Sequence, residues 1–455
     1  MPASPSTARA INDRLALRLL QQEGPLTAGQ LKQLTGLSRP TVADLVDRLT
    51  AAGLITVVGE SGEQRRGPNA RLYGIVADRA HLAALDVRTE GVFVLVSDLV
   101  GRVLAEASVP IGGDTGTGPA VEQVVAAVER TAKEAGADRL HTVGIGAPGL
   151  IDPATGDLRD SGGLPEWHRS LSVALQERLP GARVTVENET NLAALAEQRE
   201  GAARDRDTFV LLWLGHGVGA AVVLDGTLRR GASGGTGEIG FLPVPGADSL
   251  PSAQDCAGGF HSLTGASAIG TLARQHGLPT PAAMDGPGAA LVVRAAVAAV
   301  LDEREAGETA ARPRAGLTGH RGALSDPSSA GPREPFTVAA REETVMAASG
   351  THPAEAVPGD HPAAGFLRAL AERISVGAAS VVAVLDPGCV VLGGEVGQAG
   401  GPMLAGLVEE QLRRMSPLRT EVRASTLGGT AVLRGALLTA RDRAQDDLFT
   451  PPGLT

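Results

Sequence analysis

Two groups of polar side chains near the start of the chain have the chemistry to contact nucleic acid. Guanidinium groups and hydroxyls donate hydrogen bonds to phosphate oxygens and to base edges. The residues that we predict to contact DNA are Ser38, Arg39, Thr41, Arg48, Arg65, Arg66 and Arg71. Ser38, Arg39 and Thr41 stand at the start of a predicted helix, where side chains reach base edges. The arginines that follow lie in a predicted hairpin, which favours contact with phosphate or the minor groove.

The stretch from Leu26 to Tyr73 predicts the elements that position these side chains. Thr27 and Gln30 have the spacing of a capping box, which marks the start of a helix. Gly36 interrupts that helix, and Ser38 can cap the next one. A helix, a tight turn and a second helix form the helix-turn-helix, whose second helix enters the major groove.

The second helix has one apolar face and is followed by two short strands. Its predicted buried residues, at helical spacing, are Val42, Leu45, Val46 and Leu49. Strands over residues 53–58 and 71–73 make a basic β-hairpin. A further helix, over residues 7–22, is predicted to pack under the second helix of the helix-turn-helix. Residues 1–75 are therefore predicted to be a winged helix-turn-helix domain. The alternative is a helical hairpin without a nucleic-acid partner.

Composition bounds the class of protein. A chain of 455 residues exceeds one hydrophobic core, so more than one domain is expected. The absence of a run of 18 apolar residues and of an apolar N-terminal signal favours a cytoplasmic protein without a membrane partner. Cys256 and Cys389 are too few for a disulfide framework.

Charge is distributed unevenly along the chain. Residues 1–75 hold nine Lys and Arg against six Asp and Glu, a net charge of +3. The whole chain carries −10, so the remainder carries −13. A basic head on an acidic body is consistent with a head that alone meets phosphate.

Past Tyr73 the hydrophobic pattern changes to that of an α/β fold. A β-β-β-α-β-α-β order is followed by a rough repeat, which indicates one lobe over 76–190 and a second over 191–455. Two such lobes predict a cleft that binds a small ligand. The last helix of the chain, although it belongs to the second lobe in sequence, can return to pack on the first lobe. Residues 303–361 are rich in Pro, Gly, Ala and Ser, and we expect a disordered insertion there.

The chain resembles the ROK family of repressors, uncharacterised open reading frames and sugar kinases. The resemblance rests on GIGAPGLIDPATGDL from Gly144, VENETNLAALAE from Val186 and GASGGTGEIGF from Gly231. It implies a two-lobed, actin-like or ribonuclease-H-like sugar kinase fold behind the winged helix. Family members with the winged helix are mostly transcriptional repressors modulated by sugars or sugar phosphates, whereas members without it are mostly kinases.

Two departures from the family argue against catalysis. The phosphate loop of the kinases, D-x-G-G-T, corresponds here to residues 86–90, where Arg88 and Thr89 replace flexible glycines and Glu90 adds a carboxylate. The aspartate that kinases use as a base corresponds to Glu189. Its extra methylene displaces the carboxylate by about 1 Å, which costs about 10²-fold where positioning is the catalysis. We therefore predict no catalytic residue and no cofactor.

By resemblance, the sugar site also has a defined set of residues. The predicted ligand-binding residues are Gly149, Asn188, Glu189, Glu238 and Phe241. Carboxylates and amides suit vicinal hydroxyls because each satisfies several hydrogen bonds. The alternative is that Asn188 and Glu238 cap helices or bond to backbone in a relic pocket.

The resemblance also concerns a zinc site that many members carry. They have a histidine after G-E-I-G and three cysteines nearby, whereas this chain has Phe241 and Cys256 at those places. One thiolate with His261 cannot complete a tetrahedral site. We expect no zinc, and apolar packing of Phe241 and Phe260 in its place.

The leading hypothesis is a DNA-binding transcriptional regulator, a repressor of carbohydrate-related genes. Its partners would be a pseudo-palindromic operator, a sugar or sugar phosphate effector, and further copies of the chain in a homodimer or homotetramer. One alternative is an active ATP-dependent hexose kinase with a fused DNA-binding domain. Another is a regulator that responds to a protein through the 303–361 segment.

Overall fold

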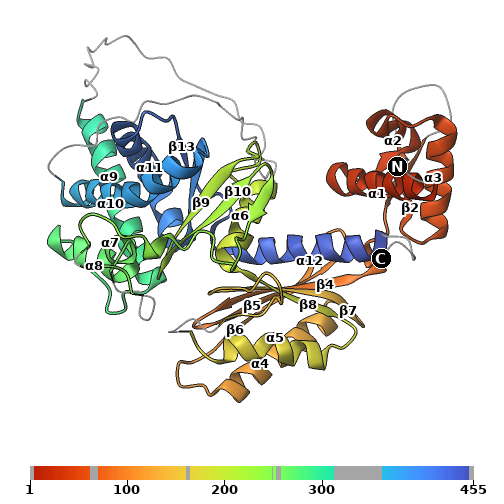
Figure 1. The fold of residues 1–455 in the computed structure, drawn as a ribbon, viewed down its shortest axis with the longest axis horizontal. Coiled ribbons are helices and arrows are strands. Elements are labelled where there is room, and N and C mark those ends of the chain that lie inside the picture. The colour runs from red at the N-terminus through yellow and green to blue at the C-terminus, as the bar shows by residue number, and fades with distance from the viewer. Residues whose placement is uncertain are drawn as a thin grey trace, which may run out of the picture.

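The structure is a computed structural model that describes residues 5–61, 70–159, 164–247, 249–252, 258–311 and 361–449. The described residues form a small N-terminal head and two α/β lobes (Figure 1). Within those residues, no helix combines the length and the apolar character needed to span a membrane.

The head has the predicted winged helix-turn-helix fold. Its helices are α1 (Pro5–Glu23), α2 (Ala28–Thr35) and α3 (Arg39–Ala51), and its strands are β1 (Leu26–Thr27), β2 (Ile55–Ser61) and β3 (Ala70–Ile75). β3 lies between β1 and β2 and is antiparallel to both. The sequence did not predict β1, whose two residues are too few to show a strand pattern.

Local capping explains where the head's helices begin and end. The Thr27 backbone N–H donates to Gln30 Oε1 at 2.8 Å, and the Gln30 N–H donates to Thr27 Oγ1 at 3.2 Å, so the predicted capping box is present. Gly36 ends α2 in the left-handed region, with φ of 70°. The Ser38 hydroxyl caps α3 by accepting from the Thr41 N–H at 3.3 Å. The four predicted apolar residues of α3 are buried.

The first lobe is built on a five-stranded sheet of order β6-β5-β4-β7-β8. Its strands are β4 (His81–Arg88), β5 (Gly91–Asp98), β6 (Val103–Pro110), β7 (Leu140–Ala147) and β8 (Arg183–Asn188), preceded by the short helix η1 (Ala77–Arg79). Helices α4 (Thr117–Glu134) and α5 (Trp167–Arg178) cover the sheet face that lies away from α12 (Figure 1). The helices and strands of this lobe match those predicted from the sequence.

The second lobe repeats this plan in a sheet of order β11-β10-β9-β12-β13. Its strands are β9 (Phe209–Leu214), β10 (Val218–Leu224), β11 (Thr227–Arg229), β12 (Cys389–Gly393) and β13 (Glu421–Ala424). In each sheet the first three strands run antiparallel in sequence order, and the two later strands run parallel to the first. The predicted internal repeat is confirmed by this shared topology.

Helices of the second part of the chain surround this sheet and connect it to the first lobe. They are α6 (Glu189–Glu200), η2 (Ile239–Phe241), α7 (His261–Thr264), α8 (Ala266–Gln275), α9 (Gly286–Ala311), α10 (Pro362–Leu385), α11 (Gly394–Met415), η3 (Gly428–Thr430) and α12 (Ala431–Phe449). A disordered insertion was expected over 303–361, but residues 303–311 of that segment are helical, because α9 continues to Ala311. The rest of that segment, 312–360, lies outside the described residues.

Helix α12 returns from the second lobe to the first and ends at the head (Figure 1). It packs on β4, β7 and α6. Its apolar residues Ala440, Ala444 and Phe449 share one buried cluster with Leu17 and Leu20 of α1. The sheets thus fall within the proposed domains 1–75, 76–190 and 191–455, and one helix touches all three.

Candidate functional site

The start of α3 presents one long cationic side chain to solvent. Arg39 is exposed, and no hydrogen bond or ion pair of its side chain is found within the described residues. Ser38 and Thr41 stand beside it, with their hydroxyl oxygens 2.8 Å apart. Both hydroxyls serve the helix cap, so they have less freedom than Arg39 to bind an external group.

Arg48 has a different environment from the one the sequence suggested. It lies in the last turn of α3, where Nη2 is 2.6 Å from Asp13 Oδ1 of α1, and it also pairs with Asp44. The side chain therefore ties α3 to α1. Its charge is already compensated, and this reduces its capacity to hold phosphate.

The wing contributes Arg71, which is exposed on β3 opposite Glu60 of β2. Arg65 and Arg66, which we also predict to contact DNA, lie outside the described residues. Of the seven predicted DNA-contacting residues, the structure describes five, and Arg39 and Arg71 are the cations among them for which it records no side-chain ion pair.

Within the lobes, Asn188 connects two of the predicted ligand-binding positions. It is the cap of α6, and its Oδ1 accepts from the N–H groups of Thr190 at 2.9 Å and Asn191 at 3.2 Å. Its Nδ2 donates to the carbonyl of Gly149 at 2.9 Å. Both ends of the amide are thus occupied by backbone, as the capping alternative proposed.

Leu150 and Ile151, which follow Gly149 in sequence, lie beside the loop that carries Glu238 from the second lobe. A Cβ on Gly235 would lie 3.6 Å from Leu150 Cδ2 and 3.7 Å from Glu238 Cγ. Gly234, with φ of 82°, approaches the Ile151 carbonyl so closely that a Cβ there would overlap it. The two loops therefore meet across the boundary between the lobes. Glu238 is half-buried, and burial raises the pKa of its carboxyl.

Phe241 lies on η2 with its ring edge-on to His261, the centroids 5.3 Å apart. His261 Nδ1 accepts from the Val218 N–H at 3.3 Å, and burial lowers the pKa of the imidazole. Phe260 is fully buried in the core of the second lobe, as expected, whereas Phe241 is half-buried. Cys256 lies outside the described residues. The described residues contain no group of three metal-ligating side chains, and an edge-on phenyl ring does not fit a zinc ligand.

Glu189, at the start of α6, lies among other carboxylates. Burial, followed by the negative charges of Asp86, Glu395 and Glu90, raises the pKa of Glu189 to about 8. At neutral pH this carboxyl is therefore mostly protonated. It can donate a hydrogen bond, and it is poorly suited to accept a proton as a base.

Asp86 and Arg88, near the end of β4, form an ion pair, and the charges of both act on Glu189. Asp86 is 1% exposed, and its Oδ2 accepts from Arg88 Nε at 3.0 Å and from Nη2 at 2.7 Å. Arg88 Nη2 also donates to the carbonyl of Gly429 at 3.0 Å, and the guanidinium carbon lies 4.7 Å from the Phe93 ring centroid. Arg88 thus bridges β4 and η3, which precedes α12.

Glu395 was not predicted as a site residue. It lies in the first turn of α11, where its Oε2 is buried without a hydrogen-bond partner in the described structure. A Cβ on Gly215 would overlap that oxygen. Burial raises the pKa of Glu395. No motif discussed for the sequence marks this glutamate.

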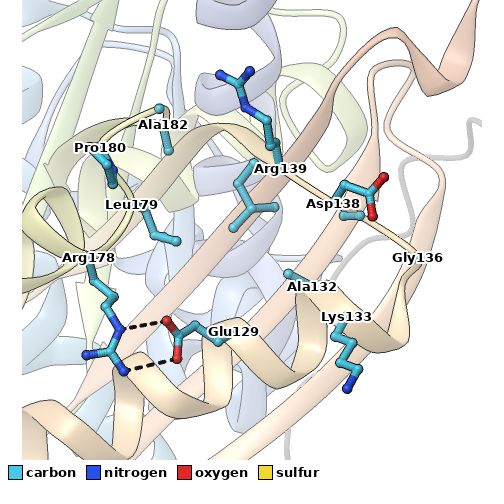
Figure 2. A pocket seen from close by; sticks show the side chains of 13 residues that line it. Glu129, Ala132, Lys133, Gly136, Asp138, Arg139, Arg178, Leu179, Pro180 and Ala182 are labelled. Carbon is cyan, nitrogen blue, oxygen red and sulfur yellow. Dashed lines mark hydrogen bonds and ion pairs between the residues drawn. The ribbon is translucent and has the colours of Figure 1, made fainter.

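Two hollows are found in the described surface. One of about 560 Å³ lies between the ends of α4 and α5 and is lined by Lys133, Arg139 and the Glu129–Arg178 ion pair (Figure 2). A larger one, of about 990 Å³, lies beside α12 and the β10–β11 turn. Neither contains a predicted ligand-binding residue.

Comparison with known proteins agrees with the geometry of head and lobes. The head is of the MarR type, matched by that family over residues 11–67, and the ROK family matches residues 83–275 and 342–443. The fold is that of a winged helix joined to an actin-like sugar kinase domain. The chain belongs to the ROK family.

Two relatives of known name are similar in sequence. A xylose repressor of Caldicellulosiruptor bescii is 26% identical over 248 residues, which are 54% of this chain and 61% of the repressor. The DNA-binding transcriptional dual regulator NagC of Escherichia coli strain K12 is 27% identical over 246 residues, 52% of this chain and 58% of NagC. The chain spans about three fifths of the length of these curated relatives.

Solved structures support the fold. A ROK family transcriptional regulator, a homologue of the E. coli MLC protein, aligns with 97% of this chain and 98% of its own, with a TM-score of 0.67 and 19% identity. A ROK hexokinase from Thermus thermophilus aligns with 80% of this chain and 99% of its own, with a TM-score of 0.54 and 25% identity. The hexokinase match covers a smaller share of this chain.

Proposed function

We propose that this protein is a DNA-binding transcriptional regulator that represses carbohydrate-related genes. Its affinity for operator DNA would change when a sugar or sugar phosphate binds between the lobes. The observation that carries the proposal is the single buried cluster that α12 and α1 share. A regulator needs contacts between its ligand-binding lobes and its DNA-binding head, and this buried cluster provides such contacts. A cytoplasmic location follows from that role.

The head would read DNA through α3 and hold the backbone through the wing. Arg39 is exposed at the end of α3 that enters the groove, with Ser38 and Thr41 beside it. Arg71, Arg65 and Arg66 of the wing would take phosphate or the minor groove. To Arg48 we assign mainly the positioning of α3, because Asp13 and Asp44 already bind it.

Movement of the lobes can reach the head through α12. The helix begins directly after η3, which Arg88 contacts from the first lobe, and it ends against α1. A ligand that favours one lobe arrangement would therefore bias the position of α12. A coupling of about 1–3 kcal/mol is enough to change operator affinity by about 5–150-fold.

Catalysis is not part of the proposed role. A kinase needs a free phosphate loop and an ionised base, whereas Arg88 is bonded to Asp86 and Glu189 has its pKa raised to about 8. The relatives named as repressors are consistent with a regulator that does not phosphorylate its ligand. The kinase alternative predicts rapid ADP release with hexoses, which a coupled assay over a sugar panel detects.

Footprinting on DNA upstream of the protein's own gene tests the proposal. We expect protection of a pseudo-palindromic site by a dimer or a dimer of dimers, weakened or strengthened by one sugar of a panel. Failure to bind any duplex at low ionic strength would overturn the proposal. So would binding that no sugar or sugar phosphate alters.

A further inference from the structure

Four carboxylates and one guanidinium interact electrostatically across the two lobes: Asp86, Glu90, Glu189, Glu395 and Arg88. The charges of Asp86, Glu395 and Glu90 each raise the pKa of Glu189, and Arg88 alone among these groups lowers it. Asp86 and Glu90 act on Glu395 in the same direction. The electrostatic potential at Glu189 is therefore negative, and the bound guanidinium does not cancel it.

The cation of this group has little capacity left for an anion. Arg88 makes two hydrogen bonds to Asp86 and a third to the Gly429 carbonyl, and its face lies over Phe93. An incoming phosphate would have to compete with a carboxylate that is 1% exposed and cannot turn to water. Losing that ion pair would leave Asp86 buried and uncompensated.

Two buried oxygens in this group also lack donors. Neither Asp86 Oδ1 nor Glu395 Oε2 has a hydrogen-bond partner within the described residues. Buried acceptors without partners disfavour a further acceptor or negative charge beside them, because no donor offsets it. Hydroxyl and amine groups are donors, whereas a phosphate dianion offers only acceptors and negative charge.

We propose that the effector is an unphosphorylated sugar, selected against its phosphorylated form by the carboxylates of Asp86, Glu90 and Glu395 around Glu189. The inference rests on the proposed sugar-sensing function and narrows it. By the family resemblance, Glu189 stands where kinases hold the base that faces the hydroxyl to be phosphorylated. A phosphate on that hydroxyl would lie against the carboxylates.

Isothermal titration calorimetry on the full chain tests this with matched pairs: glucose and glucose 6-phosphate, and N-acetylglucosamine and its 6-phosphate. In every pair that gives measurable binding, the free sugar should bind about tenfold tighter or more. That ratio should fall modestly as ionic strength rises, because the discrimination is electrostatic and salt screens buried charges less than exposed ones. A purely steric site would show the same ratio at all salt concentrations.

Charge-neutral variants identify the source of the discrimination. Glu90→Gln and Glu395→Gln should each reduce the ratio of the two affinities by raising affinity for the phosphate. Glu410→Gln is the matched control, since it removes the same charge from α11 at a position paired with Arg414. It should leave the ratio unchanged.

The outcomes separate the inference from the function on which it rests. A phosphorylated sugar that binds as tightly as its free form, or a ratio unmoved in both variants, overturns the inference and leaves sugar sensing intact. Failure of both members of every pair to bind removes the proposed sugar sensing, and the inference with it.

Discussion

Gln445 of the last helix donates a hydrogen bond from Nε2 to Gln21 Oε1 of the first helix, over 2.9 Å. The same amide donates to the Leu99 carbonyl at 3.3 Å, so head, first lobe and α12 meet at one side chain. Gln445 is buried. This contact joins the end of α12 directly to the winged-helix head and to the first lobe.

Replacing Gln445 with Ala should weaken the coupling between ligand and DNA. The change leaves the buried Leu99 carbonyl without this donor, which costs about 1–3 kcal/mol of stability. The ratio of operator affinities with and without effector should move toward one. Thr439→Ala is the control, because the bond that the described residues show for the Thr439 hydroxyl is a local one, to the Gly435 carbonyl within α12. An unchanged ratio in Gln445→Ala would argue against coupling between the lobes and the head through Gln445.

Arg39→Ala should reduce specific binding more than binding to random DNA. Loss of a base contact costs about 1–3 kcal/mol on the specific site, whereas loss of a phosphate contact weakens both kinds of DNA alike. Arg71→Ala should instead lower the salt slope of binding by about one. Fluorescence anisotropy at several salt concentrations measures both quantities. Equal losses on specific and random DNA for Arg39→Ala contradict the assignment.

Ser38 has two roles that substitutions can separate. Ser38→Ala removes the α3 cap and should destabilise the head by about 0.5–2 kcal/mol, measured by hydrogen exchange of α3. Ser38→Asp retains a capping oxygen, so stability should be kept. Its added negative charge should nevertheless weaken DNA binding through repulsion by phosphate. If Ser38→Asp binds DNA normally, the start of α3 does not lie at the duplex.

The raised pKa of Glu189 predicts a pH-dependent cost to stability. The carboxyl holds its proton in the folded chain up to about pH 8, whereas in the unfolded chain it ionises near pH 4.3. The folded state therefore binds more protons between these values, and stability falls as pH rises through that window. Glu189→Gln should raise Tm relative to the parent by an amount that grows up to about pH 8 and is then constant. A difference independent of pH would contradict the burial of this carboxyl among like charges.

Local patterns predicted the head, and they predicted the order of strands and helices along the chain of the first lobe. The Thr27–Gln30 capping box and the Ser38 cap join residues three positions apart, so spacing alone reveals them. Arg48 differs, because its partner Asp13 is 35 residues away and becomes a neighbour only when α1 packs on α3. A cation exposed on a helical wheel was therefore predicted to be free for DNA.

The candidate ligand site was predicted less completely for the same physical reason. Asn188 was expected to meet sugar, yet its amide bonds to Gly149, 39 residues away in sequence. Glu395 joins Asp86 and Glu189 only through the pairing of the two lobes, and no motif marks it. The resemblance indicated which loops meet between the lobes, whereas the compensation and burial of each charge depend on three-dimensional packing.

We propose that a ligand bound in the lobes alters the affinity of the head for DNA. The dissociation constant for the footprinted operator tests this, measured at fixed salt without sugar and with a saturating free sugar. We expect a change of about 5–150-fold. Identical constants in the two titrations, for every sugar that binds the protein, would contradict it.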